Sequence, residues 1–260
     1  MSEDPSVDRR LPARPGTWEA IRVVAGRELG AYFDSPIAYV FATAFLVLSC
    51  SAYMNSFFLA SVADLSAYFQ ALPFLLVLFA PAITMRTWSE EHAQRTWELV
   101  ATLPLRSAEV ILGKYLAAVL FYLAVLLGTL PLVLMLLWLG DPDLGLIAAS
   151  YLGAVFLGAF FLAFGVFVSS LTRNQIVAFV LAAALASLFV LSGHAAVVEV
   201  VDGLAPAWQP GTWVRDHLSA LPQYEAFTNG VVGLGPVLYF ALMSAFFLWM
   251  NELALRRGKL

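Results

Sequence analysis

The chain has 260 residues, of which 61% are hydrophobic and 12% are charged, and its formal net charge is −4. Soluble domains contain about 45–50% apolar and about 25% charged residues, so this composition excludes an ordinary soluble protein and favours a membrane protein. Its mean hydropathy of +0.83 agrees with that class. No basic patch with interleaved aromatic residues is found in the sequence, so we expect no nucleic-acid partner.

The first 36 residues precede the first long apolar run. Residues 1–16 are rich in proline and charge, which predicts a disordered tail. Residues 17–34 predict an amphipathic helix, because apolar side chains recur there at helical spacing, at Trp18, Ile21, Ala25 and Leu29. Since the first apolar run follows directly, we expect this helix to lie in the membrane interface; the alternative is a solvated helix that packs on a partner.

Six apolar runs predict transmembrane helices, because a helix needs ~20 apolar residues to cross a bilayer. They form a predicted transmembrane domain over residues 35–250, with a cytoplasmic tail over 251–260. Pro131 predicts a kink in the third run. The runs are Ile37–Leu59, Leu65–Met85, Tyr115–Leu139, Leu146–Leu171, Ile176–Val198 and Val231–Met250.

The positive charges are sorted to one side of these runs. Thirteen of the fourteen Lys and Arg residues lie before the first run, after the second, after the fourth or after the last, and Arg215 is the exception. Because loops rich in Lys and Arg stay in the cytoplasm, the pattern predicts that both termini are cytoplasmic. No Asp, Glu, Lys or Arg lies inside a run, which argues against an ion-coupled carrier.

The polar segment after the second run carries the most informative side chains. Thr87 with Glu90 predicts a capping box, followed by a short helix that runs to about Ala101 and stops before Pro104. Ser107 with Glu109 predicts the start of the next helix, which enters the membrane near Lys114. We interpret the short charged and aromatic helix as a docking surface; the alternative is an ordinary solvated loop helix.

Catalytic and ligand-binding motifs are missing from the sequence. The residues around Gly113 and Lys114 fail the phosphate-loop pattern, so we expect no ATP to bind to this chain by that route. His194, Glu199, Asp202 and His217 follow no known metal-ligand spacing. We therefore expect no metal, no cofactor and no catalytic residue here.

The first run contains small polar residues, at Thr43, Ser49, Ser51 and Asn55. They are candidates for lining a polar pathway through the membrane. The alternative is that the hydroxyl groups bond back to their own helix backbone, as they commonly do in apolar helices.

The segment after the second run resembles the permeases of ABC-2 type transporters. The resemblance rests on an ordered set of features, namely Glu90-Glu91, Thr96-Trp97-Glu98-Leu99, Pro104 and Gly113-Lys114. Residues 221–230 and 237–240 look like the smaller branch that includes the gliding-motility permease GldF. The chain departs from the pattern at Arg95, where family members commonly have glycine.

The resemblance implies an all-α integral membrane protein with six transmembrane helices, in a prokaryotic inner membrane. It implies a non-catalytic permease subunit that couples ATP hydrolysis to the movement of a substrate. ATP and Mg²⁺ would be bound by a separate ABC-type ATPase, next to a second permease chain and an accessory membrane or periplasmic subunit. The alternative is a non-transporting scaffold that anchors an ATPase for motility or mechanical work on envelope proteins. The residues implied in coupling to the ATPase are Glu90, Glu91, Gln94, Arg95, Trp97 and Glu98.

Overall fold

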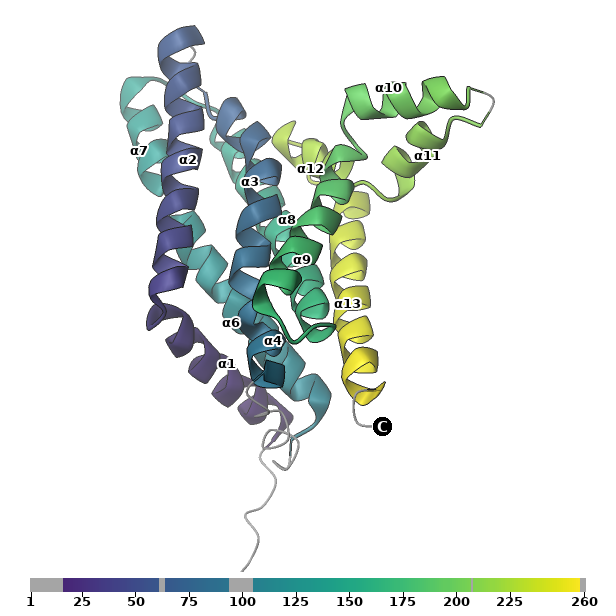
Figure 1. Cartoon of the computed structure of the whole chain (residues 1–260). Helices are drawn as coiled ribbons and strands as arrows, with labels where there is room; N and C mark the ends of the chain where they lie inside the picture. Colours follow the sequence, from purple (N-terminus) through teal and green to yellow (C-terminus); the bar gives the residue numbers. More distant parts are fainter. Residues whose placement is uncertain (1–15, 61–63, 94–104, 207, 258–260) are drawn as a thin grey trace, which may run out of the picture.

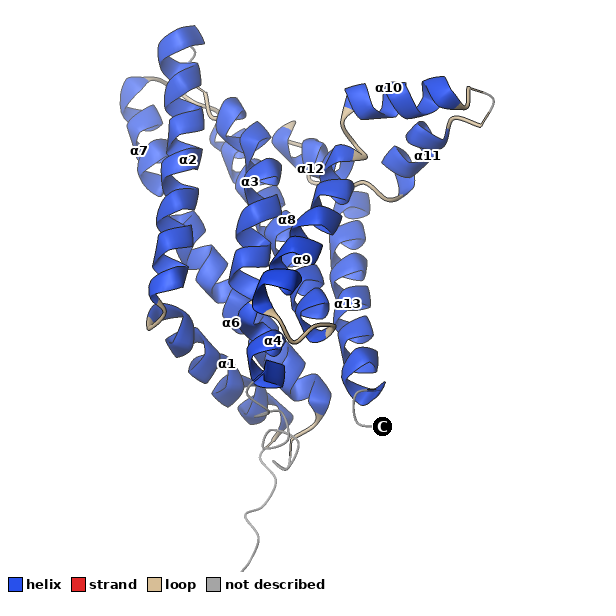
Figure 2. Ribbon diagram, in the orientation of Figure 1, coloured by secondary structure: helices blue, strands red, loops and turns tan. Residues whose placement is uncertain are grey.

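The computed structural model describes residues 16–60, 64–93, 105–206 and 208–257. Every regular element in these ranges is an α-helix, which confirms the predicted all-α class (Figure 2). Five helical segments within them are long and apolar enough to cross a membrane, and the count rises to six if a bent pair of helices forms one crossing. The prediction of a multi-pass membrane protein is therefore confirmed.

The chain begins with α1 (Thr17–Phe33), which meets α2 (Pro36–Ala60) at a sharp turn (Figure 1). The next crossing joins α3 (Ser66–Thr84) to the short α4 (Arg86–Ala93). The following helices are α6 (Ser107–Leu127), α7 (Leu130–Leu139), α8 (Leu144–Ser170) and α9 (Gln175–Leu191). The last are α10 (Ala195–Leu204), α11 (Pro210–His217), α12 (Leu221–Thr228) and α13 (Leu234–Arg257).

Helix α8 forms the centre of the bundle, in contact with α3, α4, α6, α9, α12 and α13. Three of its glycines allow this close packing, because each lies where a Cβ atom would collide with a side chain of another helix. Gly153 lies against Phe227, Gly158 against Tyr122, and Gly165 against Thr84. In contrast, α2 lies at the edge of the bundle and leaves most of its surface exposed.

The two ends of the bundle differ in charge. One end, called the basic end below, holds α1, α4, the start of α6 and the end of α13, with Arg27, Arg86, Lys114 and Arg256 (Figure 1, lower side). The opposite end holds α10, α11 and α12, and α10 with α11 extends sideways from the bundle (Figure 1). Arg215 lies at this opposite end, on α11.

The third predicted span is interrupted just before Pro131, where the sequence predicts a kink, and its two helices still form one candidate crossing. Helix α6 ends at Leu127, and α7 begins at Leu130 with Pro131 in its first turn. Proline has no N–H and clashes with the carbonyl four residues earlier, so a helix ends a few residues before it. Thr129 stabilises the break, because its buried hydroxyl group bonds the carbonyl of Leu126 at 2.6 Å and the phenol of Tyr68 at 3.2 Å.

The fifth predicted span, Ile176–Val198, is not one continuous helix. The chain turns at Ser192–His194, and α10 leaves α9 at an angle of 82°. The carbonyl of Phe189 accepts hydrogen bonds from the hydroxyl of Ser219 and from the N–H of Ala220, which holds the segment before α12 against this end of α9. Gly193 fits there because Ser219 and Leu221 leave no space for a Cβ atom.

The sixth predicted span begins later and ends later than expected. Helix α13 starts at Leu234 and continues to Arg257, into the segment predicted to be a cytoplasmic tail. Arg256 and Glu252 form an i,i+4 ion pair of 2.6 Å near its end, which supports an additional helical turn.

Candidate functional site

Helix α4 is held at its first turn by a serine from another part of the chain. The first N–H groups of a helix have no partner within it. Here the N–H groups of Trp88 and Ser89 donate to Oγ of Ser169, on α8, at 3.1 and 3.3 Å. The same hydroxyl group donates to the carbonyl of Met85 at 3.0 Å. Helix α4 is therefore attached to the centre of the bundle.

The indole of Trp88 anchors α4 from the inside. Its side chain is completely buried in a small apolar cluster at the basic end, which also contains Val24, Val110, Ile111, Val166 and Leu255. These side chains come from α1, α6, α8 and α13. The short α4 therefore shares one apolar contact region with four neighbouring helices.

Lys114 is the polar centre of this end. Its ammonium group donates to a carboxylate oxygen of Glu91 at 2.8 Å, to one of Glu28 at 3.1 Å, and to the carbonyl of Thr87 at 3.0 Å. It also lies 4.9 Å from the centre of the Trp88 ring. Only 2% of the lysine side chain is exposed. These five residues, the Lys114 cluster, connect α1, α4 and α6.

Arg27 completes the charge balance of the cluster. Its guanidinium group lies 2.7 Å from Glu28 and 3.8 Å from Glu91, so two cations face two carboxylates. Burial would raise the pKa of Glu28, but the charges of Lys114 and Arg27 outweigh that effect and lower its pKa. Glu28 is therefore ionised at neutral pH. Removing one partner would leave a buried charge without compensation.

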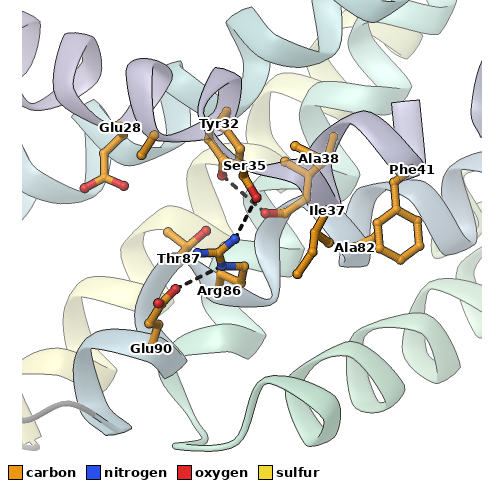
Figure 3. Close-up of a pocket in the computed structure, with 12 residues that line it drawn as sticks. Glu28, Tyr32, Ser35, Ile37, Ala38, Phe41, Ala82, Arg86, Thr87 and Glu90 are labelled. Carbon is orange, nitrogen blue, oxygen red and sulfur yellow. Dashed lines mark hydrogen bonds and ion pairs between the residues drawn. The ribbon is translucent and has the colours of Figure 1, made fainter. Parts of the chain in front are cut away.

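A second polar contact joins α4 to the turn between α1 and α2. Nε of Arg86 donates to Glu90 at 2.9 Å, and Nη1 of Arg86 donates to Oγ of Ser35 at 2.8 Å (Figure 3). Tyr32 adds a contact to α3, because its hydroxyl group donates to the carbonyl of Ile83 at 3.3 Å. Helix α4 is thus connected to the α1–α2 turn through Arg86 and to Glu28 of α1 through Lys114 of α6.

The structure places the predicted coupling residues in two groups. Glu90 and Glu91 lie on α4 and make the contacts described above. The others, Gln94, Arg95, Trp97 and Glu98, lie outside the described residues, as does the rest of the helix predicted to reach Ala101. The predicted capping box of Thr87 and Glu90 is wrong. Helix α4 begins at Arg86, so Thr87 lies inside it, and Ser169 serves its first turn.

The apolar stripe predicted for the first helix packs on protein. Ile21 and Ala25 are buried with Ala20 and Val24, and α6 is the main partner of α1. Tyr32 extends this contact by stacking on Phe121, with ring centres 5.2 Å apart. Leu29 is half-buried and Trp18 is 72% exposed. Contact of α1 with the membrane interface stays a prediction, and Trp18 is now the stripe residue best placed for it.

The candidate pathway residues do not share one face of α2. Thr43, Ser51 and Asn55 are exposed, whereas Ser49 is fully buried and donates to the carbonyl of Leu46 at 3.0 Å. For Ser49, the alternative therefore holds, namely that the hydroxyl group bonds to the backbone of its own helix. The other three lie four or eight residues apart, which places them on one side of a helix.

The polar residues at the opposite end have a structural role in the described part of the chain. Asp202 accepts hydrogen bonds from the N–H groups of Gly211 and Thr212 and from the hydroxyl of Thr212, so it caps α11. Within the described ranges, no group of three or more His, Cys, Asp or Glu side chains is placed to hold a metal ion.

Sequence reasoning did not identify Glu28, Lys114 and Ser169 as members of one site. One signal was available for Lys114. The helix predicted from Ser107 places this lysine two turns inside an otherwise apolar helix, where a charge requires a partner. No comparable signal marked Glu28 or Ser169, because they meet α4 from distant parts of the chain.

Comparison with known families identifies the class of protein. The family described as "ABC-2 family transporter protein" matches residues 28–249. This range includes Glu28, all of α4, Lys114 and Ser169. No individual curated protein matches the chain. The match covers well over half of the sequence, and its description agrees with a multi-pass helical membrane protein, so the chain belongs to the ABC-2 family of transporter proteins.

Proposed function

We propose that this chain is a permease subunit whose movement is driven by ATP hydrolysis in a separate cytoplasmic ABC-type ATPase. The Lys114 cluster carries the proposal, because it joins α1, α4 and α6 through buried charges directly before the segment that contains Trp97 and Glu98. A force applied to α4 or to that segment reaches α1 and α6 together, since bending α4 alone would separate buried charges.

The distribution of charge supports the orientation that this function requires. The basic end contains Arg27, Arg86, Lys114 and Arg256, and the opposite end contains Arg215. By the positive-inside rule, the basic end faces the cytoplasm, and both termini lie there in a prokaryotic inner membrane. In this orientation, α4 faces a soluble ATPase, which would bind ATP and Mg²⁺, and the chain itself needs no cofactor.

The exposed face of α2 supports a second permease chain. Thr43, Ser51 and Asn55 lie on a helix that is long enough to cross the bilayer, since its 25 residues extend ~37 Å. Polar side chains exposed to lipid are unfavourable, so they normally face another helix or a water-filled path. We propose that an identical or related chain covers this face, and that these residues line the path between the two.

The test is to purify the chain with its ATPase from the native membrane in mild detergent and reconstitute the complex in lipid vesicles. We expect Glu98→Arg to abolish the ATP hydrolysis that the permease stimulates while leaving membrane insertion unchanged. Arg256→Gln, which removes an exposed ion pair of the same end, should leave stimulation unchanged. Absence of any ATPase from the purified complex, or full stimulation by the Glu98 variant, would refute this function. Stimulation without movement of any solute would favour a force-transducing scaffold.

A further inference from the structure

A cavity lies beside the Lys114 cluster, between the turn that joins α1 to α2 and the junction of α3 with α4 (Figure 3). The cavity holds about 90 Å³ and opens to the surface. It lies at the boundary of the apolar region, because α2 begins its span at Pro36 and α3 ends at Thr84. A ligand in this cavity would therefore touch both the apolar core of the membrane and its polar surface.

The lining of the cavity changes from polar to apolar. Glu28, Ser35, Arg86 and Glu90 surround one part of it (Figure 3). The other part is lined by apolar side chains of α2 and α3, namely Ile37, Ala38, Phe41, Ala82 and Ile83. Such a lining matches a ligand with a charged head and a hydrocarbon tail, which is the chemistry of a membrane lipid.

Arg86 offers hydrogen-bond donors to the head of such a ligand. A guanidinium group has five N–H donors. Two of its nitrogens donate to Glu90 and Ser35, and among the described residues no partner is found for the third, Nη2. The side chain remains 36% exposed. A free edge of guanidinium at a membrane boundary is well suited to a phosphate oxygen.

The two carboxylates of the cavity select among phospholipids. Glu28 and Glu90 both line it, so a head group with additional negative charge meets repulsion. A primary ammonium group would be attracted to these carboxylates and could donate three hydrogen bonds, whereas a quaternary ammonium group has no N–H to donate. The cavity therefore favours a phosphate next to a primary ammonium group.

We propose that this cavity is a binding site for a phospholipid with an ethanolamine head group from the leaflet at the basic end. Its phosphate accepts from Arg86, its ammonium group lies near Glu28 and Glu90, and an acyl chain follows Ile37 and Phe41 into the membrane. Because Ser35 and Glu90 belong to different segments, the bound lipid stabilises the contact between α4 and the α1–α2 turn. The site requires only the membrane location of the chain, and not the proposed ATPase.

The test compares lipids with identical acyl chains and different heads. The purified chain is reconstituted in nanodiscs with equal amounts of phosphatidylethanolamine, phosphatidylcholine and phosphatidylglycerol, and native mass spectrometry measures the lipid that stays bound after release into detergent. We expect phosphatidylethanolamine to be retained in preference to the other two. Arg86→Gln should reduce its retention roughly tenfold, as expected for one lost charge-assisted hydrogen bond. Arg256→Gln removes another i,i+4 ion pair, away from the cavity, and should change nothing.

A second pair of variants tests the apolar part without touching a charge. Ala38→Leu narrows the cavity and should reduce lipid retention, whereas Ala44→Leu adds the same atoms at an exposed position of α2 that does not line it. Melting temperature measured in the same detergent confirms that each variant is folded. The proposal would be overturned if the three lipids were retained equally or if phosphatidylglycerol were preferred. It would also be overturned if both Ala38→Leu and Arg86→Gln retained the lipid fully.

Discussion

The ammonium group of Lys114 lies 2.8 Å from the carboxylate of Glu91, although 23 residues separate them in the chain. The same group reaches Glu28, 86 residues away, at 3.1 Å. One buried cation therefore joins the helix that precedes the membrane domain to the helix that leaves its second crossing. Such a contact depends on both carboxylates and on the exclusion of water, which makes it sensitive to single substitutions.

Replacing the buried cation should destabilise the protein strongly. Lys114→Met keeps the apolar part of the side chain but leaves Glu28 and Glu91 facing each other without the buried ammonium group. Breaking a buried ion pair by removing one partner costs about 3–5 kcal/mol. We expect a clear fall in melting temperature in detergent. Arg256→Gln breaks an exposed pair, worth about 0–1 kcal/mol, and serves as the control. Equal melting temperatures for the two variants would contradict the central role of Lys114.

The contribution of Glu28 to the stability of the folded protein should decrease as the pH falls. Its pKa in the folded protein lies below the ordinary value of 4.5, because Lys114 and Arg27 outweigh the effect of burial. A lowered pKa contributes stability that is present above the ordinary value and is lost as pH falls through the folded value. We expect the melting-temperature difference between the wild type and Glu28→Gln to be constant from pH 7 to about 5 and to shrink below about pH 4.5. A difference that stays constant to pH 3.5 would show that the charge of Glu28 is unimportant.

Ser169, which accepts hydrogen bonds from the first turn of α4, should contribute more to stability than the neighbouring Ser170. Ser169→Ala removes the acceptor for the N–H groups of Trp88 and Ser89, and loss of a comparable helix cap costs about 0.5–2 kcal/mol. Ser170 donates to the carbonyl of Phe167 within its own helix. We expect Ser169→Ala to lower the melting temperature and to increase hydrogen exchange at Trp88 and Ser89. Ser170→Ala should do neither; the opposite ranking would contradict this reading of α4.

Helix packing at the centre of the bundle should be intolerant of a single methyl group. In Gly158→Ala, the new Cβ atom would collide with the ring of Tyr122, and overpacking of a core typically costs about 1–3 kcal/mol. Gly26, on α1, has open space around its Cα atom, and alanine there should stabilise the helix by about 0.5–1 kcal/mol. Thermal unfolding in detergent would measure both. A neutral Gly158→Ala would mean that α6 and α8 do not approach as closely as described.

Local sequence patterns predict the break between α6 and α7 but not the bend between α9 and α10. Pro131 predicts a kink because proline disrupts the hydrogen bonding of a helix, and the structure places a short break just before it. The bend between α9 and α10 could not be predicted from the apolar pattern, because Ile176–Val198 forms one continuous apolar run. The bend depends on Ser219 and Ala220, which bond Phe189 from a segment 30 residues later.

The sequence by itself determined the membrane class, the approximate crossings and the sorting of positive charge, because each follows from hydropathy and charge counted along the chain. It also pointed to the segment after the second crossing, through Glu90 and Glu91. Only the tertiary structure decided which side chains meet there. Glu28, Thr87, Glu91 and Lys114 come together because α1 packs on α6 while α8 holds α4, and these contacts depend on three-dimensional packing between residues far apart in sequence.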